Sequence, residues 1–220
     1  MLRTITAALL GTVLLLLAVP TVSAAETLDC VGEFTGTHDG NLRVPSGEFC
    51  IIIGAEVTGN VLVEDGALGF HSHGSIIGKN VIVEGVQLDV RILNSEVGGY
   101  VDIANSGNAG TIGAICASEI GGNVRFTNNA GVYALGATGF GGVCPEGDVI
   151  GGNLIIEDNA AHFVIRGEEV GRNLQLMNNT GGATLIANQV EKNLNCEGNV
   201  PPPAGAGNVA ERKKGQCANL

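Results

Sequence analysis

The sequence has no tryptophan, and aromatic residues make up only 4% of its 220 residues. A conventional core built around large aromatic side chains is therefore excluded. Basic residues are also scarce, with 11 Lys and Arg against 22 Asp and Glu, which gives a formal net charge of -11. Nucleic acid is a poor partner for so acidic a chain, and the one basic cluster, Arg212 to Lys214, is too small to change this.

The motifs of several common enzyme classes are also missing. The sequence contains no G-x-S-x-G, no Walker loop, no H-E-x-x-H and no glycine-rich calcium-binding nonapeptide. None of the six cysteines belongs to a C-x-x-C pair, which argues against a zinc site. The repeated Thr-x-Thr of ice-binding solenoids is absent as well. What remains is a glycine-rich chain, with 35 glycines, whose aliphatic residues must be buried in some other way.

The first residues are typical of a secretory signal peptide. Arg3 precedes an apolar run from Ala7 to Val19, and small residues surround Ala24. The run is shorter than the roughly 20 residues that cross a bilayer. We therefore predict a signal peptide over residues 1–24 and a secreted or cell-surface mature chain without a transmembrane segment.

A repeat of about twenty residues follows. Its anchor is an asparagine that usually comes after glycine and before an aliphatic residue. The anchors are Asn41, Asn60, Asn80, Asn123, Asn153, Asn173 and Asn193, with Tyr100 once in the same place. Two coils are longer, and the longest contains the insertion from Ala137 to Asp148. Asparagine suits sharp corners and can form amide ladders, so we expect the anchors to be structural and to adopt left-handed backbone.

Apolar residues in each repeat form three columns. The residues one and three places after the anchor are apolar, as in Val61 and Val63, and this period of two predicts a short strand. A second strand is expected to bury Phe70, Val90 and their equivalents, with Ile112 in the neighbouring column. A third column precedes the glycines. We therefore predict an all-β fold: a single-stranded parallel β-helix, right-handed, with three short strands per coil.

The expected organisation is one solenoid. Residues 25–50 would form the N-terminal cap and first coil, 51–196 the regular coils, and 197–220 a disulfide-stapled C-terminal cap, with the prolines Pro201 to Pro203 ending the repeat. Disulfides persist in exported proteins. Pairing in sequence order would join residues one coil apart, so we predict the pairs Cys30–Cys50, Cys116–Cys144 and Cys196–Cys217.

The runs Ile150-Gly151-Gly152-Asn153-Leu154 and Val170-Gly171-Arg172-Asn173-Leu174, with the closing Asn193 to Cys217 segment, resemble small secreted β-solenoid repeat proteins of unknown function from high-GC Gram-positive bacteria. The architecture also resembles the pectin-lyase-like parallel β-helices. Both resemblances imply a fold, and the first also an exported location; neither implies an activity.

Four outward features are candidate sites. Glu64, Asp65 and Glu84 fall at matching places on consecutive coils, where stacked carboxylates could hold Ca²⁺ or a polysaccharide, although acidic residues are also ordinary at turns. No other cofactor is indicated. His71, His73, Asp89 and Arg91 are expected on one face of the second strand, as a patch suited to binding an anion or to acid–base chemistry.

The other two features are apolar. Leu62 and Ile82 are neighbours in one outward column and could form a docking strip, although scattered surface aliphatics are ordinary. Phe140 lies in the insertion, where solenoids often contact partners, although flexible glycine-rich slack is the ordinary alternative. The sequence favours a non-catalytic scaffold or binding rod whose partner is a cell-wall or extracellular polysaccharide or a protein. The alternative is a carbohydrate-active enzyme, a lyase or hydrolase, on a β-helix.

Overall fold

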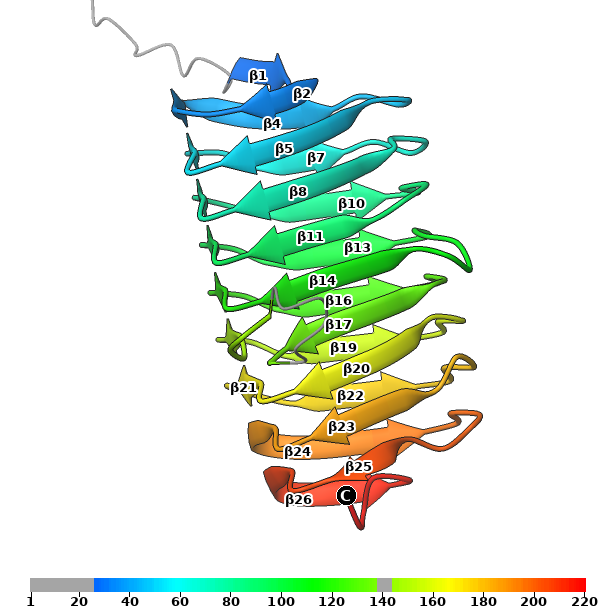
Figure 1. Ribbon diagram of the computed structural model, residues 1–220. Helices are drawn as coiled ribbons and strands as arrows, with labels where there is room; N and C mark the ends of the chain where they lie inside the picture. Colours follow the sequence, from blue (N-terminus) through cyan, green and yellow to red (C-terminus); the bar gives the residue numbers. More distant parts are fainter. Residues whose placement is uncertain (1–25, 138–143) are drawn as a thin grey trace, which may run out of the picture.

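The computed structural model describes residues 26–137 and 144–220, and every regular element in these two ranges is a β-strand. Figure 1 shows the strands stacked coil upon coil from the N-terminal to the C-terminal end. Strands equivalent in successive coils pair in parallel about twenty residues apart, which gives a solenoid of about nine turns. The predicted signal peptide, residues 1–24, lies outside the described residues.

Each regular coil contributes three strands. The long strands that follow the anchors form a face called sheet A here: β1 (Glu26–Asp29), β4 (Gly40–Val44), β7 (Val61–Val63), β10 (Val81–Glu84), β13 (Val101–Ala104), β16 (Val124–Thr127), β19 (Leu154–Glu157), β22 (Leu174–Met177), β24 (Gln189–Glu197) and β26 (Val209–Gly215).

The opposite face, called sheet B, has nine strands: β2 (Gly32–Phe34), β5 (Phe49–Ile53), β8 (Gly69–His73), β11 (Val90–Leu93), β14 (Ile112–Cys116), β17 (Val132–Gly136), β20 (His162–Arg166), β23 (Ala183–Ile186) and β25 (Ala204–Ala206).

Two-residue strands form the narrow third side and join sheet A in one 17-stranded sheet: β3 (Thr37–His38), β6 (Glu56–Val57), β9 (Ile76–Ile77), β12 (Glu96–Val97), β15 (Glu119–Ile120), β18 (Val149–Ile150) and β21 (Glu169–Val170).

The solenoid is right-handed. In Figure 1 the strands of sheet B, at the front, run from right to left, whereas those of sheet A, at the back, run from left to right while the chain descends. Rotation in this sense with this advance is a right-handed superhelix. The predicted fold class is therefore confirmed.

The core lies between the sheets and follows from the period-two pattern. In β7, for example, Val61 and Val63 are buried while Leu62 between them is only half-buried, and each pairs with the residue twenty places on. Burial of aliphatic surface contributes about 25 cal/mol per Å². In the middle coils three aromatic rings, Phe126, Tyr133 and Phe163, pack with centroids 5.0 to 5.4 Å apart.

One predicted column was wrong in one coil. Ile115, not Ile112, pairs with Ile92 and is buried, whereas Ile112 is half-buried. The three extra residues of this coil lie before β14, in the loop after Ala104, so counting from the anchor places the second strand three residues too early. The loop leaves the stack at a corner and returns in register.

Hydrogen-bonded side chains hold the corners together. In the anchor ladder the backbone N–H and the amide of an asparagine donate to the side-chain oxygen of the asparagine one coil before it, as from Asn60 to Asn41 Oδ1 at 2.8 and 3.1 Å. The ladder continues at Asn80, and Tyr100 joins it through its backbone N–H alone, at 2.9 Å. The expected ladder is confirmed, but the left-handed backbone lies elsewhere.

A second, buried ladder runs through Asn129, Asn159, Asn179 and Asn199. Here the direction is reversed: Asn129 N–H donates to Asn159 Oδ1 at 2.8 Å, in the following coil. Each amide also donates to a carbonyl of the inner strand wall, as from Asn179 to Ile156 O at 2.8 Å. The residue before each of these asparagines has positive φ, for example Asn128 at 55° and Asp158 at 57°. These preceding residues, rather than the anchors, make the sharp corner.

A third ladder was not predicted. Its members lie two places before the third inward column: Ser75, Ser95, Ser118, Asp148, Glu168, Asn188 and Asn208. Each accepts the backbone N–H of the equivalent residue in the preceding coil. What the members share is a side-chain oxygen rather than one residue type, so no repeated letter marks the ladder in the sequence.

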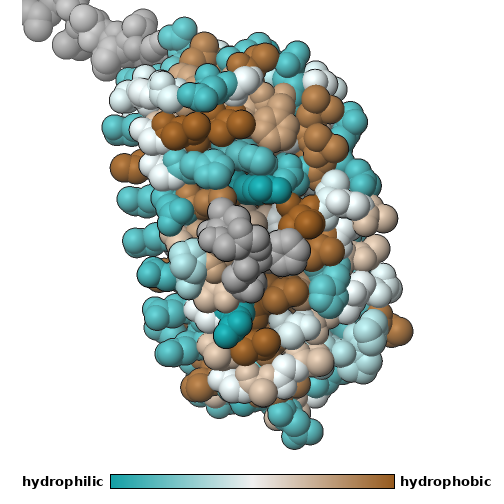
Figure 2. Space-filling model, viewed as in Figure 1, coloured by the Kyte–Doolittle hydropathy of each residue, from teal (hydrophilic) through white to brown (hydrophobic). Residues whose placement is uncertain are grey.

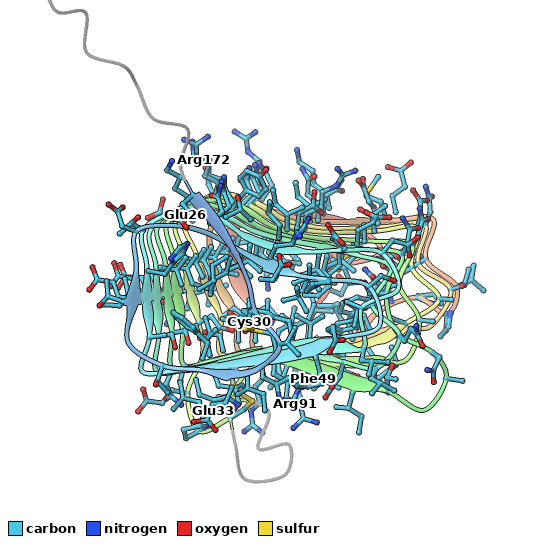
Figure 3. The ribbon with its side chains drawn as sticks, turned by 90° about the horizontal axis from the view of Figure 1, so that it is seen from above. Glu26, Cys30, Glu33, Phe49, Arg91 and Arg172 are labelled. Carbon is cyan, nitrogen blue, oxygen red and sulfur yellow. A yellow bond between two sulfur atoms is a disulfide. The ribbon has the colours of Figure 1, made fainter. Side chains whose placement is uncertain are left out.

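The predicted disulfides are present. Cys30–Cys50, Cys116–Cys144 and Cys196–Cys217 have Cα–Cα distances of 5.5, 5.3 and 5.3 Å, and the structure contains no free cysteine among its described residues. Figure 3 shows Cys30 inside the first coil, between the two sheets. The first and last bridges therefore lie at the two ends of the core.

The prolines do not end the repeat. After them β25 pairs with β23 and β26 pairs with β24, so residues beyond Glu197 add a further turn, with a register irregularity in β24 between Val190 and Asn193. The chain then turns back, Cys217 is buried, and Gln216 Oε1 accepts from Asn199 N–H and its amide at 3.0 and 2.9 Å. Gln216 thus ends the buried asparagine ladder.

We predict that Asn179→Ala strongly destabilises the fold. The substitution removes the acceptor of Asn159 N–H and the donor to the Ile156 carbonyl, both buried. A buried polar group left unpaired costs about 1–3 kcal/mol, so the free energy of unfolding should fall by about 3 kcal/mol in urea denaturation. The control is Asn153→Ala in the half-exposed anchor ladder, where water can replace the amide and the loss should stay below about 1 kcal/mol. Equal losses would show that burial does not set the strength of the ladders.

Candidate functional site: a polar cluster on the outer face of sheet B

Three consecutive strands of sheet B bring the predicted histidine patch together. Register pairs His71 with Ile51 in the coil before and with Arg91 in the coil after, and His73 pairs with Ile53 and Leu93 in the same way. In Figure 2 a hydrophilic band crosses this face over β8 and β11, with hydrophobic side chains over the preceding coil. Arg91 and Phe49 project from the same side of the rod, away from Arg172 on the opposite side (Figure 3).

Asp89 holds the cluster together. It precedes β11, and its Oδ1 lies 3.1 Å from His71 Nε2 while its Oδ2 forms an ion pair with Arg91 Nε at 2.8 Å. The side chains of His71 and Asp89 are only 15% and 14% exposed, but Arg91 is 38% exposed. Arg91 therefore presents its outer N–H groups to solvent from a fixed position.

Phe49 supplies an apolar surface beside this cluster, and the sequence did not single it out. Its ring lies over Gly69, where an added Cβ would come within 2.4 Å of it, and it meets the His71 ring in a T-shaped contact with centroids 4.8 Å apart. Gly69 therefore leaves space for the ring. Extending the outward column back by one coil and two residues would have identified Phe49.

The electrostatics follow from this packing. Burial acts to raise the pKa of Asp89, but the hydrogen bond and charge of His71 and the charge of Arg91 outweigh it, and the pKa is lowered. Burial lowers the pKa of His73, and the charges of His71 and Arg91 act in the same direction. At neutral pH the cluster therefore holds an ionised aspartate, an arginine and a neutral His73.

A shallow groove of about 260 Å³ continues from the cluster toward β14. Asp89 and Arg91 form one side of it, and Gly110 and Thr111 of the loop before β14 form part of the other. The three-residue insertion in this coil therefore builds a wall of the groove.

A small apolar cluster lies next to this site on the outer face of sheet B: Leu93, Ala114, Cys116, Ala134 and Cys144. Register places Leu93 directly beside His73, and the Cys116–Cys144 bridge fixes the end of the predicted insertion here. Phe140, the predicted contact residue, lies outside the described residues.

The other apolar candidates lie on sheet A. Leu62 and Ile82 are neighbours in register, as predicted, but both are half-buried and stand between Arg43 and Asp102 in a single column. They form part of a mixed surface rather than a separate apolar strip.

The predicted carboxylates do not converge on a cation site. Glu64 lies 3.6 Å from Arg43, and Glu84 accepts a hydrogen bond from Asn105. In residues 26–137 and 144–220 no group of three or more His, Cys, Asp or Glu side chains is arranged to hold a metal ion. The Ca²⁺ hypothesis for Glu64, Asp65 and Glu84 thus gains no support.

Comparison with known proteins adds no relative: no protein-family model, no curated protein and no solved structure matches the chain. The suggested likeness to secreted repeat proteins of high-GC Gram-positive bacteria rests on the sequence motifs alone. Within the part of the chain that the structure describes, no helix is long and apolar enough to span a membrane.

We predict that Asp89→Asn destabilises the protein in a pH-dependent way. Because the folded pKa of Asp89 is lowered, its ionised form contributes stability above the ordinary pKa, and that contribution is lost as the pH falls through the folded value. The variant should lose about 1–2 kcal/mol of unfolding free energy at pH 7, and the difference should disappear toward pH ~2. Urea titrations across this range, with Glu33→Gln on exposed β2 as control, provide the measurement. A pH-independent loss would contradict an electrostatic origin.

Proposed function

We propose that the protein is an exported, non-catalytic binding rod that holds an extracellular or cell-wall polysaccharide at the Phe49–His71–Asp89–Arg91 cluster. The observation that carries the proposal is the juxtaposition of an aromatic ring, a fixed and partly exposed guanidinium, and a groove on one face. Sugar rings pack their C–H faces on aromatic side chains, and their hydroxyl or carboxylate oxygens accept hydrogen bonds from arginine.

Export is supported by the three disulfides, which are typical of extracellular proteins. The stapled, ladder-bonded body would give the site a rigid support. Rigid placement of binding groups lowers the entropy that association costs, so a shallow site on such a body can still bind.

Binding is favoured over catalysis because both carboxylate oxygens of Asp89 already have partners. Its two oxygens are bonded to His71 and Arg91, so this carboxylate would have to break a charge-assisted hydrogen bond before acting as a base or nucleophile. The groups that remain available at the cluster are donors and an apolar ring, which suit recognition.

One observation favours the second candidate, a carbohydrate-active enzyme. On the outer face of sheet A, burial raises the pKa of Asp102, and Glu84 and Glu157 add to this against the opposing charge of Arg125. A carboxyl whose pKa is raised beside other carboxylates is what a general acid in glycoside cleavage requires. This second site lies on the opposite sheet, so the two functions can be separated by mutation.

The test is retention of the purified, oxidised mature protein on pectic, wall and capsular polysaccharides, with and without Ca²⁺, while new reducing ends and unsaturated products are followed. We expect saturable retention without turnover. Arg91→Ala and Phe49→Ala should each weaken binding about tenfold, equivalent to ~1.4 kcal/mol. The matched control is Arg166→Ala, an exposed arginine on β20 of the same sheet.

The outcomes distinguish the candidates. Equal weakening by Arg91→Ala and Arg166→Ala would show that binding depends on overall charge rather than on this cluster. That result would overturn the proposed location. Turnover that Asp102→Asn abolishes would replace the binding rod with the enzyme. Absence of retention on every polysaccharide tested would overturn the proposed ligand class.

A further inference from the structure

The third ladder contains two consecutive acids where its neighbours have neutral side chains. Ser118 precedes them and Asn188 follows, but Asp148 and Glu168 between these are carboxylic acids with relative exposures of 1% and 0%. Burying one unpaired carboxylate is costly, and burying two side by side is more so. The ladder must therefore accommodate the protons that keep these acids from being two adjacent buried charges.

Each acid uses one oxygen in the ladder and has one left over. Asp148 Oδ1 accepts from Ser118 N–H at 2.9 Å, and Glu168 Oε2 accepts from Asp148 N–H at 3.2 Å. The other oxygens, Asp148 Oδ2 and Glu168 Oε1, are buried and have no hydrogen-bond partner. Orphaned oxygens are absent from the asparagine members of the same ladder.

Asn188 shows what the second atom does elsewhere in the ladder. Its Nδ2 donates to Asn208 Oδ1 at 2.8 Å and to the Ile165 carbonyl at 3.1 Å. A carboxyl oxygen in the place of this nitrogen faces acceptors, so it can replace the amide only if it carries a proton. One proton therefore supplies the missing donor at one of the two acids, and two protons supply it at both.

Among the described residues, no cationic side chain forms an ion pair with Asp148 or Glu168. The neighbours in the ladder, Ser118 and Asn188, are neutral, Gly136 contributes only backbone, and the adjacent charged residues Glu146, Arg166 and Glu169 are exposed. Each acid is thus the principal titratable neighbour of the other. Burial raises the pKa of Asp148 to about 7, and burial together with the charge of Asp148 raises the pKa of Glu168 well above its ordinary value.

We propose that Asp148 and Glu168 form a proton-binding pair that closes this corner of the solenoid when protonated and loosens it when both acids ionise. The orphaned oxygens and the amide-like positions that they occupy carry the proposal. When protonated, the pair reproduces the asparagine ladder; when doubly ionised, it places two negative charges side by side in the core.

The position of the pair indicates which part of the fold would loosen when both acids ionise. Asp148 lies at the returning end of the insertion, four residues after Cys144, which the disulfide ties to Cys116. Glu168 Oε1 lies so near Gly136 that an added Cβ there would come within 2.3 Å of it. Both flanks of the insertion therefore rest on the proton-binding pair.

The first test is thermal unfolding of the intact, oxidised protein between pH 4 and pH 8.5. Since both folded pKa values lie above their unfolded values, the pair contributes stability that is fully present below pH ~4 and is lost as the pH rises toward and beyond 7. Glu168→Gln and Asp148→Asn keep the shape and supply an amide. Each should match the wild type at low pH and exceed its melting temperature by several degrees at pH 8.

The matched control is Glu169→Gln, which removes the same charge from the exposed neighbouring position. It should keep the pH dependence of the wild type. A Glu168→Gln profile that runs parallel to that of Glu169→Gln would overturn the proposal, because the buried acid would then contribute no proton linkage.

The second test needs no variant to fold. Carboxyl ¹³C chemical shifts of the wild-type protein, followed through a pH titration, report directly on the protonation of Asp148 and Glu168. We expect at least one of the two to stay protonated at pH 6, and exchange protection of the Ser118 and Asp148 amides, corrected for the intrinsic rate, to fall as the pair ionises. Two ordinary titrations near pH 4 would overturn the proposal.

Discussion

Each coil is fixed to the next by corner side chains that accept the backbone N–H of the equivalent residue in a neighbouring coil. Corners are where a solenoid is weakest, because the chain turns out of the sheets and its amides lose their ladder partners. The asparagine, serine and acidic side chains restore those partners, at 2.8 Å in the bond from Asn129 to Asn159. The continuity of the stack through two insertions depends on these bonds.

The insertions show how far this constraint reaches. The three extra residues before β14 and the longer insertion after Gly136 both leave and re-enter at corners, and strands on either side keep their register. The outer face of sheet B consequently carries the irregular features of the rod. The groove beside Arg91 and the Cys116–Cys144 bridge lie beside these insertions, and the buried Asp148 lies at the corner where the longer insertion returns.

Much of the fold could be predicted because period and residue type repeat together. The aliphatic columns, the anchor asparagines and the spacing of Cys30 and Cys50 each recur with the coil, so one coil indicates the next. Ile112 was misplaced because the sequence does not show where within the coil the three extra residues lie. The third ladder was missed because its serine, aspartate, glutamate and asparagine members share a side-chain oxygen at one position but are not one residue type.

The candidate site was predictable in part for the same reason. Alternation along β8 and β11 put His71, His73 and Arg91 on one face, and the structure confirms it. The contribution of Phe49 depends on the empty space above Gly69, and the orphaned oxygens of Asp148 and Glu168 depend on burial. Both are properties of three-dimensional packing that residue spacing does not record.

The direction of the ladders has a consequence for the rod as a whole. In the two buried ladders N–H groups point toward the C-terminal end, whereas in the anchor ladder they point toward the N-terminal end. The N–H dipoles of the two buried ladders therefore point the same way along the axis, and those of the anchor ladder oppose them. The rod therefore has a direction, and its two ends differ chemically. The C-terminal end has to offer acceptors, as Gln216 does for Asn199.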